Sequence, residues 1–225
     1  RGFFKKVLDG RPRLTLKLAL SLDGRIGTHK GESQWITGSL ARRDVHALRA
    51  KHDAILIGGG TARKDNPSLT VRGIGQRPQP VRIVVSKGLN FDGTSLKSTR
   101  SDAPLWLCHG SDSHEVKHWE KNSDKLLRVN HFEDGSLDLS DMLQKLGSEG
   151  ITSIFCEGGG ALAASLIKAD LVDDLIVYSA GLLIGGDGLA SISELGLKKL
   201  NASVRFSLVS EKVVGGDLCH YWCRK

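Results

Sequence analysis

Long apolar runs, aromatic residues and clustered cysteines are all scarce in this chain of 225 residues. No apolar stretch approaches the roughly 20 residues that a membrane-spanning helix needs, so we expect no membrane partner. The basic start, "RGFFKKVLDGRPR", lacks the apolar core and the small-residue cleavage site of a secretion signal. We therefore expect no secretion signal at this start, and the cysteines considered next favour a reduced, cytoplasmic protein.

The four cysteines do not form a metal-binding pattern. Cys108 and Cys156 end apolar runs and are typical of small buried hydrophobic residues. Cys219 and Cys223 have the spacing CxxxC, but no second Cys/His pair stands at metal-ligand spacing. We expect reduced thiols and no metal.

Positive charge exceeds negative charge without being clustered. The net charge is +7, and the basic residues are spread along the chain with no run of five or six like charges. Basic clusters interleaved with aromatics would favour nucleic acid, yet aromatics make up only 5%. We expect no nucleic-acid partner. A solvated basic surface is the simpler interpretation, but we favour a field that attracts a small anionic ligand.

Apolar, β-branched segments recur along the chain and predict strands. Several are nearly continuous, which is typical of strands covered on both faces in a largely parallel sheet. They span residues 14–22, 54–59, 81–86, 104–109, 125–130, 151–157 and 174–184.

Helices are predicted between these strands. They span 39–52, 138–147 and 160–169, with Asp138 and Gly147 at the ends of the second. The tail, 203–225, predicts an antiparallel hairpin around Gly215–Gly216. The stretch 86–103 reads as a long polar connection. The fold class is therefore α/β, with a mixed, largely parallel sheet flanked by helices and a C-terminal antiparallel hairpin.

Residues 151–167, "ITSIFCEGGGALAASLI", place a glycine turn between a strand and a helix. Backbone N–H groups and the helix dipole at such a turn favour an anion. The alternative is a tight turn without a ligand. Glu157 favours the ligand, because an acid at the end of a strand can accept hydrogen bonds from a ligand's donors.

Residues 16–37, "LKLALSLDGRIGTHKGESQWIT", hold a second group of polar residues. Lys17 interrupts an apolar strand, so its ammonium either reaches solvent or contacts a ligand. Asp23 and Gly24 form the centre of a turn, so we interpret Asp23 as structural. Ser33 and Trp35 follow in an exposed loop, where they offer a hydroxyl and a flat apolar face; core packing of Trp35 is the alternative.

Residues 54–73, "AILIGGGTARKDNPSLTVRG", join an apolar strand to three further glycines. Thr61, Asp65 and Arg72 are predicted to lie in the loop that follows. Arg72 and Arg49, at the end of the preceding helix, offer two planar guanidinium groups that suit a phosphate. Solvated surface charges are the alternative.

Together these segments resemble the reductase domain of the bifunctional deaminase-reductase of riboflavin biosynthesis, over essentially the whole chain. "ALSLDGRIG" also resembles the opening strand and turn of dihydrofolate reductase, whose fold that reductase family shares. The resemblance implies an oxidoreductase that uses NADPH to reduce 5-amino-6-(5-phosphoribosylamino)uracil to 5-amino-6-(5-phosphoribitylamino)uracil. The alternatives are a dihydrofolate-reductase-like NADPH oxidoreductase acting on another pyrimidine or a pterin, and a nucleotide-binding regulatory module without catalysis.

The resemblance also implies site residues. Lys17 and Glu157 take the catalytic positions. The cofactor contacts are Ala19, Trp35, Thr61, Asp65, Gly159, Gly160, Ala161, Leu162, Ala163, Ala164 and Ser165, and the substrate contacts are Ser33, Arg49, Leu69, Arg72 and Glu157. To these we add Ser86 and Lys87, which follow a predicted strand at the edge where ligands of α/β sheets bind, and which we expect to contact the 2′-phosphate of NADPH.

The chain is expected to be one reductase domain, residues 13–225, preceded by a linker remnant, residues 1–12. That remnant resembles the link after the deaminase domain. The zinc deaminase signature, HxE followed by PCxxC, is absent, so deamination is not assigned to this chain. We expect a deaminase domain fused upstream in the full-length protein. We also expect a homodimer that pairs through the hairpin tail or an edge strand such as 174–184.

Overall fold

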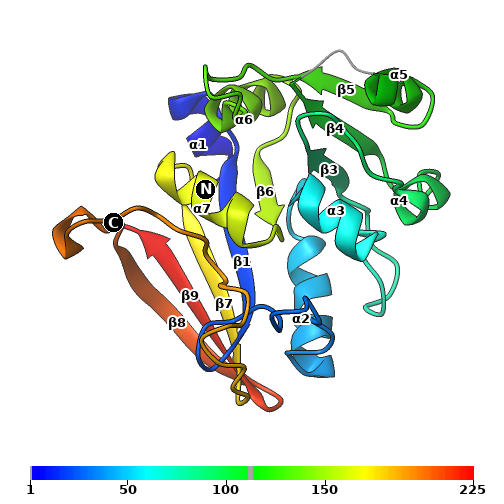
Figure 1. The fold of residues 1–225 in the computed structure, drawn as a ribbon. Helices are drawn as coiled ribbons and strands as arrows, with labels where there is room; N and C mark the ends of the chain where they lie inside the picture. The colour runs from blue at the N-terminus through cyan, green and yellow to red at the C-terminus, as the bar shows by residue number, and fades with distance from the viewer. Residues whose placement is uncertain (1, 111–113) are drawn as a thin grey trace. The chain divides into compact units, whose positions relative to one another are not determined.

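The structure is a computed structural model that describes residues 2–110 and 114–225. The described residues form two compact units. The first comprises the residues up to 13 together with 46–156, and the second comprises 14–45 and 157–225. Figure 1 labels most of the helices and strands of both.

A parallel sheet with the strand order β5-β4-β3-β2-β6 forms the centre of the first unit. All but one residue is buried in each of β2 and β3, as expected for strands covered on both faces. Apolar side chains that include Ile57, Val84 and Trp119 form the core. The strands are β2 (Ala54–Gly58), β3 (Val81–Val85), β4 (Leu105–His109), β5 (Lys125–Arg128) and β6 (Ser153–Cys156).

Helix α6 (Leu139–Ser148) confirms the predicted helix at 138–147 and its cap. The carboxylate of Asp138 accepts hydrogen bonds from the amides of Ser140 and Asp141, at 2.9 and 3.1 Å. Gly147, however, does not end the helix. A Cβ at Gly147 would lie 2.6 Å from the carbonyl oxygen of Gly10, so this glycine permits close packing rather than capping.

Four further helices of the first unit were not predicted: α1 (Gly2–Asp9), α3 (Gly59–Asp65), α4 (Thr94–Ser98) and α5 (His114–Glu120). The prediction that Thr61 and Asp65 lie in a loop is therefore wrong. Helices this short gain their stability from packing rather than from local propensity, and the buried side chains of Ala62 and Leu96 supply it in α3 and α4.

Of the expected linker, residues 1–12, residue 1 lies outside the described residues and Gly2–Asp9 form α1. Among residues 2–110 and 114–225, no helix is long and apolar enough to cross a bilayer.

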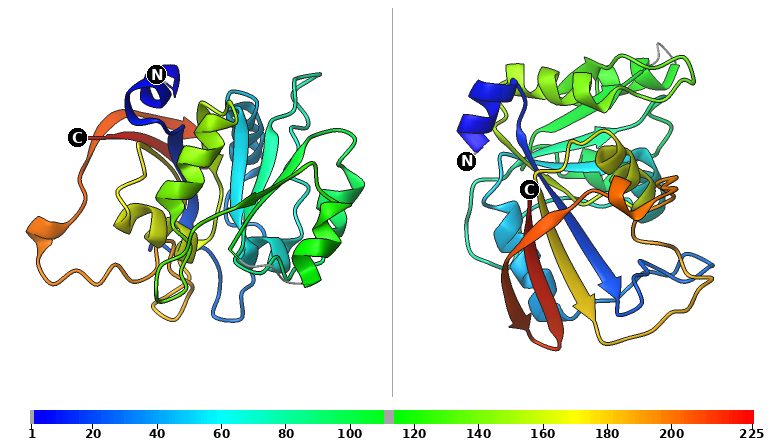
Figure 2. Two further views of the ribbon diagram at one scale, coloured as in Figure 1. Left: turned by 90° about the horizontal axis from the view of Figure 1, so that it is seen from above. Right: turned by 90° about the vertical axis from the view of Figure 1, so that its left-hand side faces the viewer.

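The second unit combines parallel and antiparallel pairing. Strand β1 (Arg13–Ser21) pairs in parallel with β7 (Asp174–Ala180), and β9 (Asp217–Arg224) pairs antiparallel with both β7 and β8 (Phe206–Val214). The unit also contains α7 (Gly160–Lys168), most of α2 (Ser39–Arg49) and a 3-10 turn, η1 (Leu200–Ala202). Figure 2 shows the four strands side by side. The mixed α/β class and the C-terminal hairpin are confirmed.

The interpretation of 174–184 as an edge strand is wrong. Strand β7 ends at Ala180 and lies between β1 and β9, so both of its edges are hydrogen-bonded. Strand β8 ends the strand order instead, and most of its residues are exposed.

Arg82, on β3, is a fully buried cation that joins several loops of the first unit. Its guanidinium donates to the carbonyls of Ser68, Leu96 and Ala103, at 3.1, 3.1 and 2.6 Å, and to the hydroxyl of Thr99 at 2.6 Å. Burial lowers the pKa of Arg82 to about 10, so the group stays charged at neutral pH. These bonds attach the loop after α3 and the helix α4 to the sheet.

We predict that Arg82→Met lowers the free energy of unfolding by about 3 kcal/mol or more, because buried carbonyls lose their donor. Urea denaturation measures the change. Arg100→Met is the matched control, since Arg100 makes a partly exposed ion pair with Asp124 and should cost less than about 1 kcal/mol. Equal losses in the two variants would contradict the prediction.

Candidate functional site

The predicted site residues are divided between the two units, and the residues of each unit are described separately. The first unit holds Arg49, Thr61, Asp65, Leu69, Arg72, Ser86 and Lys87, and the second holds Lys17, Ala19, Ser33, Trp35, Glu157 and the turn from Gly159 to Ser165.

Arg49 and Arg72 come from segments that bind one another. The Arg49 guanidinium donates to the carbonyl of Thr70 at 3.1 Å. The Arg72 amide donates to Nδ1 of His46, one helical turn before Arg49, at 3.2 Å. The end of α2 and the loop after α3 are therefore held together. The side chain of Arg72 is exposed and that of Arg49 is half-buried, so both cations lie at the surface of this region.

Thr61 and Asp65 lie one turn apart on α3 and so share a face of that helix. Partial burial raises the pKa of the Asp65 carboxyl, and the nearby charge of Lys64 opposes the rise. Leu69 follows with a positive φ of 56° and a side chain that is only 3% exposed, inside the apolar core. The side chain of Leu69 is therefore part of the core, and only its main chain is left for the predicted substrate contact.

Ser86 and Lys87 follow the carboxyl end of β3. Ser86 is buried against the start of α3, because a Cβ at Gly59 would lie 2.5 Å from its hydroxyl oxygen. Lys87 extends toward the turn at 134–136. Two hydrogen bonds from Ser136 lower the pKa of Asp134 there, and the charge of Lys87 adds a smaller lowering. The two side chains thus follow one strand but contact different segments.

Lys17 and Ala19 point to the same face of β1, because strand side chains alternate. Both are half-buried, whereas Leu16 and Leu18 on the other face are buried. In the parallel register Lys17 stands opposite Ile176, and Ala19 opposite Tyr178.

Trp35 is 67% exposed, which excludes the alternative of core packing. The Arg42 guanidinium lies 4.3 Å from the centroid of its ring, in a cation–π contact, and donates to the carbonyl of Thr37 at 2.6 Å. Ser33, two residues earlier, is half-buried. The loop therefore presents an indole whose position Arg42 restrains.

Two of the three glycines at 158–160 are closely packed, and of these Gly160 lies against a backbone atom whereas Gly158 lies against a side chain. A Cβ at Gly158 would lie 2.6 Å from Cδ2 of Leu162, and a Cβ at Gly160 would lie 2.6 Å from the carbonyl oxygen of Ala190. The backbone before α7 thus approaches its neighbours more closely than any side chain would allow.

The side chains of the segment from Gly159 to Ser165 do not all lie on one side of α7. The side chains of Ala163 and Ala164 are buried, and the Ser165 hydroxyl donates to the carbonyl of Ala161 at 3.0 Å. Gly159 is the N-cap of the nine-residue helix α7 and provides no side-chain cap. The main chain of the first turn, with the positive end of the helix dipole, is therefore the part suited to an anion.

Asp23 makes contacts far along the chain that sequence reasoning missed. Its carboxylate accepts hydrogen bonds from the Ser21 hydroxyl at 2.6 Å and from the amides of Ile184 and Gly185, at 3.2 and 2.7 Å. These hydrogen bonds lower the pKa of Asp23 to about 2, and the bond from Ser21 has the largest effect. The turn itself was predicted, but no local pattern indicates the partners more than 150 residues away.

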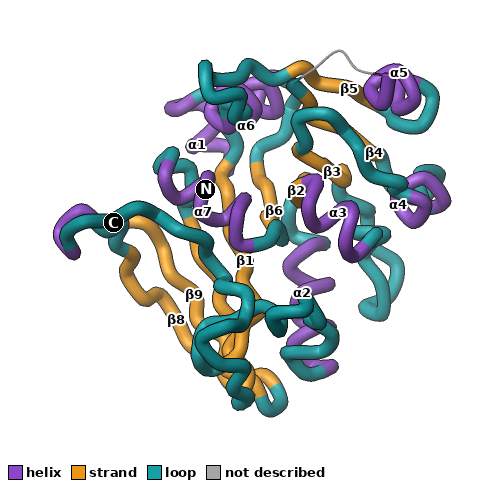
Figure 3. The backbone as a smooth tube through the Cα atoms, in the orientation of Figure 1, coloured by secondary structure: helices purple, strands orange, loops and turns teal. Residues whose placement is uncertain are grey.

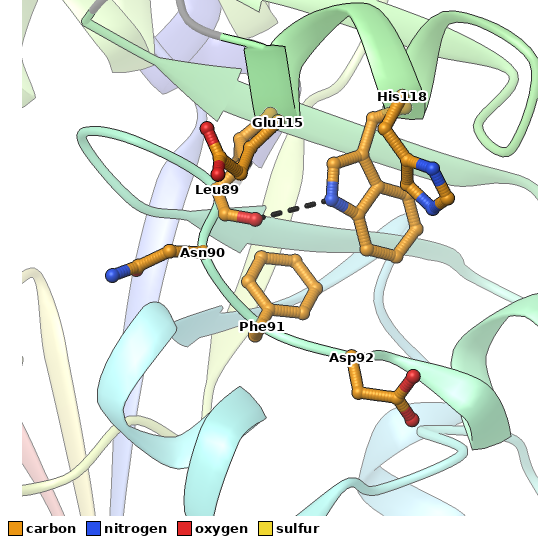
Figure 4. Close-up of a pocket in the computed structure, with 7 residues that line it drawn as sticks. Leu89, Asn90, Phe91, Asp92, Glu115 and His118 are labelled. Carbon is orange, nitrogen blue, oxygen red and sulfur yellow. Dashed lines mark hydrogen bonds between the residues drawn. The ribbon is translucent and has the colours of Figure 1, made fainter.

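A cavity of about 430 Å³ lies elsewhere in the first unit, between the segment after β3 and helix α5. The Trp119 indole N–H donates to the carbonyl of Leu89 at 3.1 Å, and the ring centroids of Phe91 and Trp119 lie 4.9 Å apart. Figure 4 shows Leu89 and Phe91 among the residues that line the cavity. None of the predicted site residues lines this cavity.

Residues 12–220 match the family described as the RibD C-terminal domain. The chain belongs to this family. The riboflavin biosynthesis protein RibD of Escherichia coli is 36% identical over 231 residues, which cover 97% of this chain and 62% of that protein.

Two solved structures are similar over the whole chain. Acinetobacter baumannii RibD has a TM-score of 0.86 and 25% identity, and 61% of it is covered. A diaminohydroxyphosphoribosylaminopyrimidine deaminase/5-amino-6-(5-phosphoribosylamino)uracil reductase from Thermotoga maritima has a TM-score of 0.83 and 26% identity, and 60% of it is covered. The chain thus spans about three-fifths of the length of these three relatives.

We predict that Asp23 contributes stability that depends on pH. Because its folded pKa, about 2, is below the unfolded value of 3.8, the contribution is fully present above pH 3.8 and is lost as pH falls through about 2. The difference in unfolding midpoint between the natural chain and Asp23→Asn should be constant from about pH 5 to 8 and should shrink between about pH 4 and 2. Thermal unfolding across this pH range measures it; a constant difference down to about pH 2 would contradict the prediction.

Proposed function

We propose that this chain reduces 5-amino-6-(5-phosphoribosylamino)uracil to 5-amino-6-(5-phosphoribitylamino)uracil with NADPH. The observation that carries the proposal is the family match over residues 12–220. The Thermotoga maritima relative, whose name includes this reductase activity, supports it. The placement of the predicted residues adds a physical basis for binding two anions.

The first turn of α7 fits the pyrophosphate of a nicotinamide cofactor. The N-cap of α7, Gly159, has no side chain, and the dipole of the helix places a partial positive charge at that end. Bound there, the cofactor would supply the hydride that the reaction needs. Trp35 offers its exposed ring to a planar group, and Thr61 and Asp65 offer polar groups from one face of α3.

Lys17 and Glu157 are the residues that we propose to act at the reacting sugar. From its half-buried position on β1, the ammonium of Lys17 can orient ribose hydroxyls or stabilise developing negative charge. Glu157 directly follows β6, and its carboxylate can accept hydrogen bonds from ribose or pyrimidine donors. The reacting carbons must be held at about 3–3.5 Å, and such positioning can supply several kcal/mol.

We propose that Arg49 and Arg72 bind the substrate phosphate. Their segments are attached to one another, and two guanidinium groups suit a phosphate dianion. Ser33 is a further predicted substrate contact, and Leu69 contributes its main chain because its side chain belongs to the core.

An absorbance assay tests the proposal directly. The purified chain, NADPH and the deaminated phosphoribosylamino-pyrimidine should give a loss of NADPH absorbance and the ribityl product. Reduction of a pterin or of another pyrimidine in preference to this substrate would overturn it.

We predict that Arg72→Lys raises the KM for the phosphorylated substrate by about tenfold, ~1.4 kcal/mol, because lysine lacks the planar fork. NADPH affinity should stay nearly unchanged. Arg77→Lys is the matched control, since Arg77 is an exposed arginine five residues further along. The dephosphorylated substrate provides the second comparison: if Arg72→Lys impairs its reduction as much as that of the phosphorylated one, Arg72 does not bind the phosphate.

We predict that Lys87→Gln lowers the preference for NADPH over NADH by about fivefold or more, because one charge-assisted contact to the 2′-phosphate is lost. Catalytic efficiency with each cofactor measures the preference. A change of equal size with both cofactors would show that Lys87 does not contact the 2′-phosphate.

Two partners complete the proposal. The RibD relatives are longer than this chain, which matches their C-terminal domain, so we propose that a deaminase domain precedes it in the full-length protein. We also propose a homodimer. Strand β8 is the candidate surface, because it ends the strand order and exposes Leu208, Val209 and Val213.

A further inference from the structure

We propose that Asp23 is a positioning residue for the cofactor turn and acts through the segment 182–193, here called the strap. The inference rests on the proposed function, since it takes the start of α7 as the NADPH pyrophosphate site. All the residues that carry it belong to the second unit.

The strap is attached to the turn that follows β1. Backbone hydrogen bonds of 2.9–3.1 Å join Leu22 to Leu182, Ile26 and Gly27 to Leu189, and Gly24 to Ser191. Apart from one isolated bridge, between Arg25 and Ala190, the strap has no helix or strand of its own. Figure 3 shows it as loop beside the loop after β1. Its position therefore depends on these contacts.

The other end of the strap contacts the start of α7. The Ser193 amide donates to the carbonyl of Gly160 at 3.0 Å. A Cβ at Gly160 would lie 2.6 Å from the Ala190 carbonyl oxygen and 3.2 Å from the Ser193 hydroxyl oxygen. The strap backbone thus lies directly against the turn proposed to hold the pyrophosphate, and any shift of the strap changes the surroundings of Gly160.

Asp23 is the charged anchor of this arrangement. Its carboxylate accepts hydrogen bonds from the amides of Ile184 and Gly185 on the strap. It also accepts a hydrogen bond from the hydroxyl of Ser21 at the end of β1. Replacing the carboxylate by an amide removes the charge that strengthens these bonds. The expected consequence is a looser strap and a less well positioned first turn of α7, without loss of any group that touches the reactants.

We expect Asp23→Asn to raise the KM and the Kd for NADPH by about three- to tenfold while kcat at saturating NADPH changes less than about twofold. Hydrogen exchange should become faster at the amides of Ile184 and Gly185. A residue that only stabilised the fold would lower the melting temperature but leave the KM of the folded protein unchanged.

Two further variants complete the experiment. Asp92→Asn is the control, because Asp92, like Asp23, accepts hydrogen bonds from a hydroxyl two residues away and from a backbone amide, both from Thr94, but in the first unit. It should leave NADPH binding unchanged. Gly188→Ala disturbs the strap without altering Asp23, since its Cβ would lie 2.7 Å from Cγ2 of Ile184 and 3.0 Å from Cγ of Arg25. It should weaken NADPH binding in the same way.

The outcomes separate the two proposals. If the natural chain does not bind NADPH, the proposed function is wrong. If the natural chain binds NADPH and the folded Asp23→Asn and Gly188→Ala variants bind it equally well, the proposed function stands and the positioning role of Asp23 is wrong. Should Asp23→Asn not fold, the binding and exchange of Gly188→Ala decide between the same results.

Discussion

The close approach of two backbones at Gly160 is the constraint on which the candidate cofactor turn depends. The carbonyl of Ala190 occupies the space that a Cβ at Gly160 would need. This contact brings a segment without regular structure against the N-terminal end of α7. A helix dipole binds an anion only where the backbone is accessible and held in place. In the proposed cofactor site, the strap and its anchor at Asp23 would meet the second requirement, and Gly159, which is half-buried and has no side chain, would meet the first.

In the first unit, the buried cation of Arg82 holds loops in place, as the strap contacts do in the second. Its parallel strands are apolar on both faces, so the loops at their ends need polar contacts of their own. Arg82 provides them by binding carbonyls from the segment after α3 and from the chain around α4. The segment that contains Arg72 is therefore attached both to β3, through Ser68, and to the end of α2, through Thr70. A phosphate-binding pair of arginines requires such restraint, because flexible guanidinium groups lose entropy on binding.

Much of the fold was predictable, because its signals are local. Continuous β-branched runs predicted the strands, since burial on both faces removes the polar alternation. Asp138 predicted the start of α6, because an N-cap acts on the next three residues. The short helices α3 and α4 were missed, because packing of Ala62 and Leu96, rather than propensity, stabilises them. The edge position of β8 was missed as well, because strand order depends on which strands pair and cannot be derived from the sequence of one strand.

For the candidate site, the sequence by itself determined the family resemblance and which residues are proposed to carry the chemistry: the glycine turn before α7, the lysine within β1 and the pair of arginines. Only the tertiary structure decided why individual residues are needed. It shows that Gly160 lies against the backbone of Ala190, that Trp35 is exposed beside Arg42, and that Asp23 accepts hydrogen bonds from a segment more than 150 residues away. The physical reason is distance along the chain. Propensity, caps and turns act over a few residues, whereas a backbone contact between Gly160 and Ala190 exists only after both segments have folded onto one another.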